Sequence, residues 1–377
     1  MFEHRDTLHK LNETLPLSEK LRFVHDVLRE RFDAIERLAV ALYDAETDMV
    51  RTFVDSGDVD SPLLHYEARL SESRSLADIV AKGVPRVVND LKIFDASGHE
   101  HARRIAASGY GASYTMPMYL DGRFFGFLFF NSRRKDIFTD DVLHHLDVFG
   151  HLIALTVIND LSSVQRLLAT VKTAREIAHA RDCETGAHLD RMARYARLIG
   201  RALAGTDRYP LSDEFIEHLF IFAPLHDIGK IAIPDHILLK PGELDAEEIR
   251  TMRRHTTLGR EIIDRMLRNF GLDDMPYVDI LRNIAQSHHE AINGEGYPQG
   301  LRGEAIPIEA RIVAVADVFD ALTSQRPYKS AWSNDRAFVT LQELAGRMLD
   351  ADCVRALIDN RTQVEEIQRR FREQPYA

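Results

Sequence analysis

Hydrophobic residues recur in steps of three and four along residues 17–42, which predicts an amphipathic helix near the start of the chain. Ser18 stands where the N-cap of that helix is expected. The pattern then changes, because residues 38–43 and 50–54 are short β-prone runs on either side of a polar, turn-like segment. The beginning of the chain therefore predicts helix and strand together.

Short elements continue to about residue 140. Residues 75–81 predict a short helix and residues 84–88 a short extended segment. The clearest signal is a hairpin, in which the apolar runs 112–119 and 124–131 flank an Asp-Gly pair at 121–122. Asp-Gly between two apolar runs favours a tight hairpin turn.

Residues 141 to about 182 predict one long helix with an apolar seam of roughly four heptads. The seam residues are Leu146, Phe149, Ile153, Val157, Leu161, Val164, Leu168 and Val171. One interpretation is a parallel two-stranded helix that makes the chain a homodimer through residues 141–182. The other is a helix packed on its own domains. We favour the first, because the seam runs between two predicted domains, where partners within the chain are fewer.

The remaining residues are helical by pattern, without internal repeats or low-complexity tracts. A chain of 377 residues is too long for one ordinary core. We therefore expect an N-terminal α/β (α+β) domain of sheet and helix at residues 1–145. A connecting helix at 146–182 and an all-α helical bundle at 183–377 complete the predicted fold.

The composition limits the classes of partner that the chain is expected to bind. The chain has 48 Lys and Arg against 59 Asp and Glu, a net charge of −11, which argues against a nucleic-acid duplex or an anionic membrane as partner. Two cysteines exclude a disulfide framework. No signal peptide and no long uninterrupted apolar run are visible, so we expect a cytoplasmic protein.

The chain has 17 histidines, and several of them stand beside acidic residues in the second half. Any one of them is weak evidence, since a single inward-facing His255 is more often a hydrogen-bonded core histidine. Asp317 is more telling, because a bare carboxylate in an almost wholly apolar helix is costly unless it binds a cation. The candidate ligands are Glu184, His188, His226, Asp227, His255, His288, His289 and Asp317.

Imidazole and carboxylate donors without thiolates favour iron or manganese, with zinc as an alternative. Eight donors exceed the need of one ion, so we expect two or three divalent metal ions that share carboxylates.

The pattern resembles the HD-GYP family of HD-domain phosphohydrolases over about residues 170–345. The matching residues are His226-Asp227-Ile228-Gly229-Lys230, Lys240-Pro241-Gly242, His288-His289-Glu290, Asn293-Gly294, Gly296-Tyr297-Pro298, Asp317, Asp320-Ala321-Leu322-Thr323 and Arg326-Pro327-Tyr328-Lys329. Asn293 stands where many members carry Asp.

This resemblance implies a set of metal ligands. The basic quartet would be His188, His226, Asp227 and Asp317. The histidines His255, His288 and His289 would extend it to a dinuclear centre. Glu184 suggests a third ion.

The same resemblance implies that the chain hydrolyses the bacterial messenger cyclic di-GMP to pGpG, to GMP or to both. Asp227 and Lys230 would be catalytic, with Lys230 beside the attacked phosphate. Arg326 and Lys329 would hold the phosphates of the substrate. Tyr297 would stack on a guanine or pack its own loop, and that loop could contact a GGDEF-domain protein.

The N-terminal part resembles a GAF domain, a small-molecule sensory fold. The resemblance rests on residues 75–80, 85–90, 117–131 and 138–141 and covers most of residues 15–155. It implies regulation of the second domain by an unknown ligand, with a purely structural or dimerising domain as the alternative.

Three functional classes remain open at this point. The first is a GAF-regulated metal phosphodiesterase, which the full ligand set and Lys230 favour. The second is a non-catalytic cyclic di-GMP receptor that acts through protein contacts. The third is an oxygenase of the HD superfamily with an iron pair, against which the Gly-Tyr-Pro motif speaks.

Overall fold

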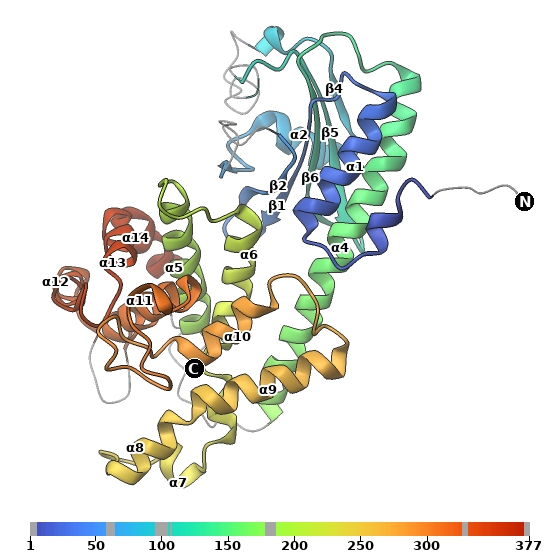
Figure 1. Cartoon of the computed structure of the whole chain (residues 1–377). Helices are drawn as coiled ribbons and strands as arrows, with labels where there is room; N and C mark the ends of the chain where they lie inside the picture. The colour runs from blue at the N-terminus through green and yellow to red at the C-terminus, as the bar shows by residue number, and fades with distance from the viewer. Residues whose placement is uncertain are drawn as a thin grey trace, which may run out of the picture. The chain divides into compact units, whose positions relative to one another are not determined.

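The computed structural model describes residues 6–57, 65–94, 105, 108–177, 186–325 and 331–372. The chain divides into two compact units, residues 1–166 and 167–377. One long helix, α4 (Asp140–Ile177), leads from the first unit into the second (Figure 1). The expected layout of a mixed unit, a connecting helix and a helical unit is confirmed at this level.

The described part of the first unit is built on a six-stranded antiparallel sheet with the strand order β3-β2-β1-β6-β5-β4. The strands are β1 (Arg37–Asp44), β2 (Met49–Asp55), β3 (Glu67–Arg69), β4 (Arg86–Val88), β5 (Ala112–Leu120) and β6 (Arg123–Ser132). The expected hairpin is confirmed as β5 and β6. Its turn holds Asp121 and Gly122 at positive φ angles of 51° and 76°, which suits the Asp-Gly pair.

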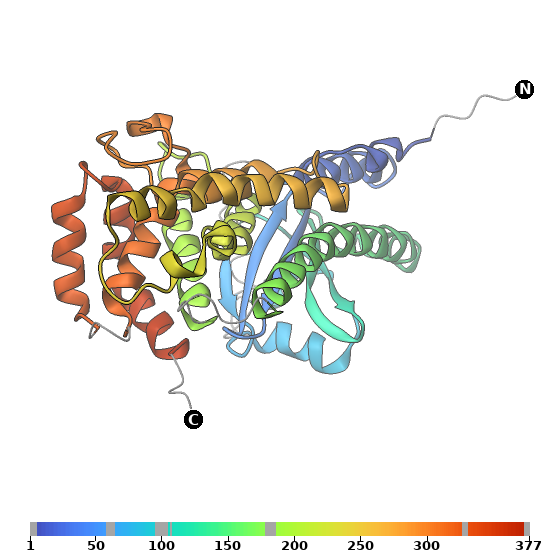
Figure 2. The same cartoon turned by 90° about the horizontal axis from the view of Figure 1, so that it is seen from below.

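Helices cover both faces of this sheet (Figures 1 and 2). The helix α1 (Leu17–Arg31) packs on β1 and β2, while α2 (Arg74–Lys82) contributes Leu76 and Ile79 to a core with Phe127 and Phe129 on the opposite face. Side chains alternate between the faces of a strand. Both faces of β6 are therefore apolar and buried.

The first helix is shorter than the sequence pattern predicts. The helix α1 ends at Arg31, and Ile35 is buried at the entry to β1. The apolar spacing continues past Arg31 because the next buried residues belong to a strand that faces the same core. Pro16, not Ser18, occupies the N-cap position, so that expectation was wrong.

The first half of α4 packs on its own sheet. A Cβ at Gly150 would lie 2.6 Å from Sδ of Met116 and 3.4 Å from Leu128, so the helix and the sheet approach closely there. Leu146 and Ile153, one turn on either side of Gly150, are buried as well. The start of the predicted seam is therefore occupied by the domain itself.

One segment of α4, Asp140–Ser162, has the length and the mean hydropathy of a membrane span, 1.3. Its apolar face contacts the sheet through Gly150, and the hydroxyl group of Tyr114 on β5 donates a hydrogen bond to Asp147 of the helix. These contacts place one face of the segment on the sheet.

The described part of the second unit is helical. Its α-helices are α5 (Gly186–Ala204), α6 (Asp213–Phe222), α7 (Asp235–Leu238), α8 (Ala246–Arg253), α9 (His255–Phe270), α10 (Val278–Ser287), α11 (Ile308–Thr323), α12 (Asn334–Leu344), α13 (Ala351–Asp359) and α14 (Arg361–Arg370). A capping box begins α8, in which the side chains of Asp245 and Glu248 each accept a hydrogen bond from the other residue's backbone N–H. The helix breaks at Arg254, so His255 begins the next helix, α9.

Candidate metal centre

Seven of the eight predicted ligands gather in two neighbouring groups of the second unit. One group is His188, His226 and Asp317, and the other is Asp227, His255, His288 and His289. Within each group the possible ligand atoms lie within 4.8 Å of one another. The groups draw on α5, α9 and α11, on the two residues that follow α10 and on the short segment at 226–227, so only the folded bundle brings them together.

Asp227 joins the two groups. Its Oδ2 lies 3.3 Å from Nε2 of His226. Its Oδ1 lies 3.1 Å from Nε2 of His255 and 3.4 Å from Nε2 of His288. The two oxygens of one buried carboxylate thus face different groups, which is the arrangement of a bridging ligand.

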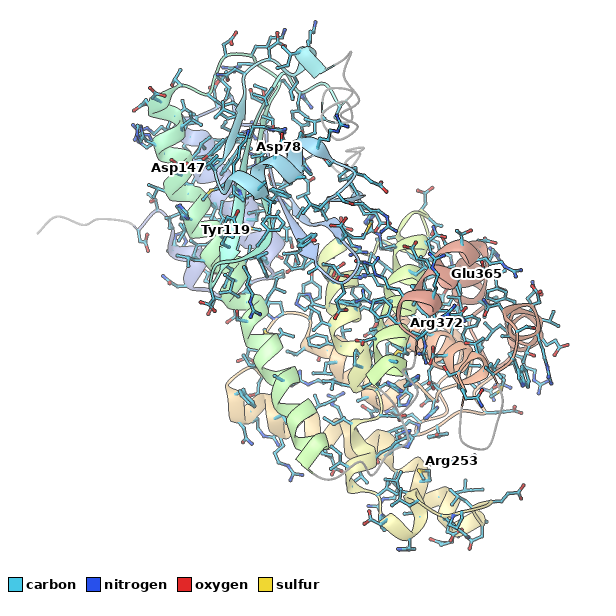
Figure 3. All side chains as sticks on the ribbon, turned by 180° about the vertical axis from the view of Figure 1, so that it is seen from behind. Asp78, Tyr119, Asp147, Arg253, Glu365 and Arg372 are labelled. Atoms are coloured by element: carbon cyan, nitrogen blue, oxygen red, sulfur yellow. The ribbon has the colours of Figure 1, made fainter. Side chains whose placement is uncertain are left out.

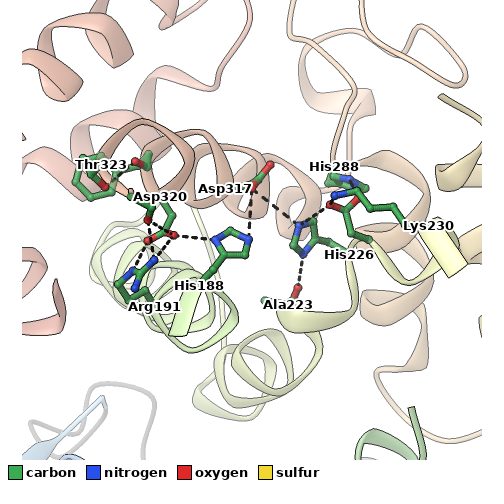
Figure 4. A network of polar contacts seen from close by, with 12 residues as sticks. His188, Arg191, Ala223, His226, Lys230, His288, Asp317, Asp320 and Thr323 are labelled. Carbon is green, nitrogen blue, oxygen red and sulfur yellow. Dashed lines mark hydrogen bonds and ion pairs between the residues drawn. The ribbon is translucent and has the colours of Figure 1, made fainter. Parts of the chain in front are cut away.

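Asp317 occupies the corresponding position within the first group. Its Oδ1 is 3.9 Å from Nε2 of His188 and 3.9 Å from Nε2 of His226, and Figure 4 shows it between the two rings. Its side chain is 20% exposed, whereas Ala316 and Phe319 on the same helix are fully buried. The carboxylate therefore reaches the open side of the group.

The far nitrogen of each ring fixes its orientation. Nδ1 of His226, His255 and His288 donates to the backbone oxygen of Ala223, Met252 and Ile284, at 3.1, 2.8 and 2.8 Å. A proton on Nδ1 leaves a lone pair on Nε2, the form that ligates a metal. Each Nε2 points toward the carboxylate of Asp227, so these residues fit a divalent ion.

Asp320 orients His188 in the same way, and the sequence did not single it out for this role. Its carboxylate is fully buried and accepts a hydrogen bond from Nδ1 of His188 at 2.7 Å. Arg191 donates to both oxygens of Asp320 at 2.7 and 2.8 Å, and Ser324 donates at 2.8 Å (Figure 4). The spacing Asp-x-x-Asp on one helix was the available signal.

Gly229 allows the two groups to approach. A Cβ at this position would lie 1.8 Å from the backbone oxygen of His255 and 2.5 Å from the backbone nitrogen of Gly259. Real Cβ atoms are not found at such distances, so only glycine fits. The turn that carries Asp227 can therefore lie directly on the first turn of α9.

Lys230 and Tyr297 border the second group. Nζ of Lys230 lies 2.6 Å from Oδ2 of Asp227. The ring of Tyr297 lies 4.8 Å from that of His289, and its backbone nitrogen donates to the backbone oxygen of His289 at 3.1 Å. Both predicted substrate-binding residues are thus adjacent to predicted ligands.

Glu290 organises the glycine-rich loop that carries Tyr297. This buried carboxylate accepts hydrogen bonds from the backbone nitrogens of Gln299 and Leu301 at 2.7 and 2.9 Å. A Cβ at Gly296 would lie 2.2 Å from the backbone nitrogen of Ala291, so the loop folds back on its own start. The loop has no regular secondary structure, but the hydrogen bonds to Glu290 and the close packing at Gly296 fix its conformation.

The charge state of the cluster suits a cation. Burial opposes ionisation of Asp227, but its interactions with His226 and Lys230 outweigh this effect and hold the pKa of the carboxyl well below its usual range. Burial lowers the pKa of the His288 imidazole, and it does the same for His289. Neutral imidazoles around an ionised carboxylate are the donors that a divalent metal requires.

Three predicted residues, Glu184, Arg326 and Lys329, lie outside the described residues.

Comparison with known proteins identifies the family. A model of the HD domain matches residues 160–353, half of the chain. The chain belongs to the HD domain family. A GAF domain model matches residues 14–157. The expected order, a GAF domain followed by an HD-type domain, is confirmed.

Two curated relatives illustrate the similarity. The chain is 45% identical over 218 residues to the cyclic di-GMP phosphodiesterase response regulator RpfG of Xanthomonas campestris. The aligned region covers 55% of this chain and 54% of the relative. It is 35% identical over 222 residues to the 3'3'-cGAMP-specific phosphodiesterase 2 of Vibrio cholerae, over 57% of this chain and 39% of the relative. The chain thus spans about half the length, or less, of these relatives.

A solved structure shares the same two domain names. The GAF domain/HD domain protein from Geobacter sulfurreducens aligns with 15% identity and a TM-score of 0.33, over 41% of this chain and 97% of that chain.

Proposed function

We propose that this HD-domain protein is a metal-dependent phosphodiesterase that hydrolyses cyclic di-GMP. The observation that carries the proposal is the position of Asp227, whose two carboxylate oxygens face two groups of predicted ligands. Such a carboxylate suits a pair of divalent ions. Relatives named as cyclic di-GMP phosphodiesterases support the substrate.

The first ion would be held by His188, His226 and Asp317, and the second by His255, His288 and His289, with Asp227 shared. Iron or manganese fits this mixture of imidazole and carboxylate donors better than zinc or calcium. When bound, two such ions activate water and neutralise the charge that develops on the phosphodiester.

A third ion is proposed at Glu184, four residues before His188. Its replacement by alanine should lower the metal content by about one ion per chain and leave the other sites filled. An unchanged ratio of metal to protein under anaerobic conditions would refute the third ion.

The reaction breaks one phosphodiester bond of the ring. A water oxygen bonds to phosphorus, the bond from phosphorus to the ribose 3′ oxygen breaks, and that oxygen takes up a proton, which gives linear pGpG. Lys230 is suited to stabilise a non-bridging oxygen, because its amine lies 2.6 Å from Asp227. Arg326 and Lys329 are proposed to hold the phosphates, with Tyr297 beside a guanine. A second cut would give GMP.

A second substrate deserves the same test, because three relatives are named as 3'3'-cGAMP-specific phosphodiesterases. Both cyclic dinucleotides carry two phosphodiester bonds, and they differ only in one base. Membership of the HD domain family does not distinguish the two substrates, so the base contacts around Tyr297 are the proposed source of selectivity.

The remaining proposals concern regulation and partners. We propose that the GAF domain binds an unidentified small ligand, that the chain works in the bacterial cytoplasm and that the glycine-rich loop meets a GGDEF-domain protein. Val148 and Leu155 on α4 are 69% and 65% exposed, which supports a homodimer through residues 141–182. A monomer in light scattering at micromolar concentration would contradict the dimer.

Hydrolysis of the two cyclic dinucleotides tests the central proposal. Anaerobically purified protein, loaded with iron or manganese, should convert cyclic di-GMP to pGpG or GMP, as followed by anion-exchange chromatography. The non-catalytic receptor class predicts binding without product. An oxygenase predicts oxygen consumption in place of phosphodiester cleavage.

A further inference from the structure

Arg253 carries an exposed positive charge beside the candidate metal centre, and none of the roles described above uses it. It is the last residue of α8, two positions before His255 (Figure 3). Its side chain forms no ion pair with a carboxylate among the residues that the structure describes. In a chain with a net charge of −11, an arginine without an acidic partner is available to an anionic ligand.

Tyr297 connects this arginine to the metal centre. The guanidinium carbon of Arg253 lies 5.0 Å from the centre of the Tyr297 ring. The same ring lies 4.8 Å from the ring of His289 and 6.3 Å from that of His255. Arg253, Tyr297 and His289 therefore form a continuous row from the exposed rim to the candidate ligands.

A guanidinium held over an aromatic ring keeps its N–H groups available. An aromatic ring attracts a cation electrostatically and accepts no conventional hydrogen bond, so the contact does not use up the five N–H donors, which point along the edges of the guanidinium plane. Those edges match the paired oxygens of a phosphate. The contact with Tyr297 thus restricts the arginine without using the donors that a phosphate would need.

We propose that Arg253, placed by Tyr297, binds the phosphate of a cyclic dinucleotide that is not being cleaved. This inference rests on the proposed function. One phosphate of such a substrate must lie at Asp227 and Lys230, so the other lies outside the ligand groups, where Arg253 would add to the contacts proposed for Arg326 and Lys329. The proposed residue is a determinant of substrate class, because a diester with a single phosphate gains nothing from it.

Arg254 provides a matched control. It is the next residue, it is equally charged and exposed, and it has no ring contact among the described residues. Its replacement removes the same charge from almost the same place. A general electrostatic effect on an anionic substrate would therefore appear in both variants, whereas a specific phosphate contact would appear only in Arg253→Gln.

The test compares steady-state kinetics of wild type, Arg253→Gln, Arg254→Gln and Tyr297→Leu as metal-loaded full chains. The substrates are cyclic di-GMP and bis(p-nitrophenyl) phosphate, a diester with one phosphate. We expect Arg253→Gln and Tyr297→Leu to raise the KM for cyclic di-GMP by about tenfold and to leave the KM for bis(p-nitrophenyl) phosphate nearly unchanged, so that the ratio of the first KM to the second rises about tenfold. Arg254→Gln should leave the ratio within about twofold of wild type.

Every other outcome contradicts the proposal in an identifiable way. Equal effects of Arg253→Gln and Arg254→Gln would show that Arg253 acts through general electrostatic attraction and not through a specific phosphate contact. Equal effects of Arg253→Gln on both substrates, or loss of bound metal, would indicate a structural role. In both cases the proposed function would stand. A wild type that cleaves the small diester but no cyclic dinucleotide would overturn the substrate class and this inference together.

Discussion

Asp320 accepts a hydrogen bond from Nδ1 of His188 at 2.7 Å, and this contact ties a fully buried carboxylate to a candidate metal ligand. Arg191 joins Asp320 to the end of the domain, because it also donates to the backbone oxygen of Phe371 at 2.9 Å. The orientation of His188 thus depends on residues that are far away in the sequence.

We expect Asp320→Asn to lower metal affinity at the first group by about 10- to 100-fold, because residues that orient metal ligands have effects of that size. The change also leaves Arg191 without its buried anion. Isothermal titration with Mn²⁺ measures the affinity. The control is Asp335→Asn, which breaks an exposed pair with Arg361 in the same domain. Equal affinities for the two variants would remove Asp320 from the account.

Lys230 should affect chemistry more than binding. Its amine lies 2.6 Å from Oδ2 of Asp227, where it can stabilise charge that grows on a phosphate oxygen in the transition state. We expect Lys230→Met to lower kcat by about 100-fold with a smaller change in KM. Arg326→Ala should instead raise KM by about tenfold, if it clamps a phosphate. Identical kinetic profiles for the two variants would refute this division of roles.

Gly229 should tolerate no side chain. An added Cβ would lie 1.8 Å from the backbone oxygen of His255, so the turn with Asp227 must move away from α9. We expect Gly229→Ala to lower both metal content and thermal stability of the metal-loaded protein. Gly186→Ala is the control, since a Cβ there has no neighbour within 4 Å among the described residues. Normal metal binding by Gly229→Ala would show that the close approach is unnecessary.

His25 should make the first unit sensitive to acid. It is buried on α1, with Nε2 2.8 Å from the backbone oxygen of Ile35 and Nδ1 2.9 Å from Oγ of Ser56. Burial lowers the pKa of this imidazole, so below pH 6.5 the unfolded chain takes up a proton that the folded domain does not. The contribution of the neutral, buried His25 to stability is therefore fully present above pH 6.5 and is lost as the pH falls below it.

Urea denaturation at pH 7.5 and 5.5 checks this sign. The urea concentration at which half of the first unit is unfolded should be lower at pH 5.5 than at pH 7.5 in the wild type. This decrease should be smaller in His25→Leu. Trp332, the single tryptophan, reports separately on the second unit by fluorescence. The exposed His151 on α4 supplies the control, and a His151→Leu variant that matched His25→Leu would contradict the assignment.

The sequence predicted which residues gather at the candidate metal centre better than it predicted how they are arranged. The ligand residues could be named because histidines and acids in apolar surroundings are unusual. Their division into two groups joined by Asp227 could not, since it depends on how α5, α9 and α11 pack. Gly229 is a further example, because its neighbour His255 is 26 positions away in the sequence.

Periodicity alone also left the partner of α4 undetermined. Steps of three and four describe a coiled-coil seam and a helix on a sheet equally well. Leu146 and Ile153 turned out to face the sheet beside Gly150, whereas Val148 and Leu155 remain on the outer side. Arg253 gave no signal at all, because an exposed arginine on an amphipathic helix is ordinary until its neighbour Tyr297 is known.

The most direct test of the central claim replaces Asp227 by alanine and measures metal content and cyclic di-GMP turnover on the same anaerobically purified sample. Wild type should hold about two or three ions per chain and hydrolyse the substrate. Asp227→Ala should lose both, because the carboxylate faces both groups of ligands. Full metal content with wild-type turnover in Asp227→Ala would contradict the account.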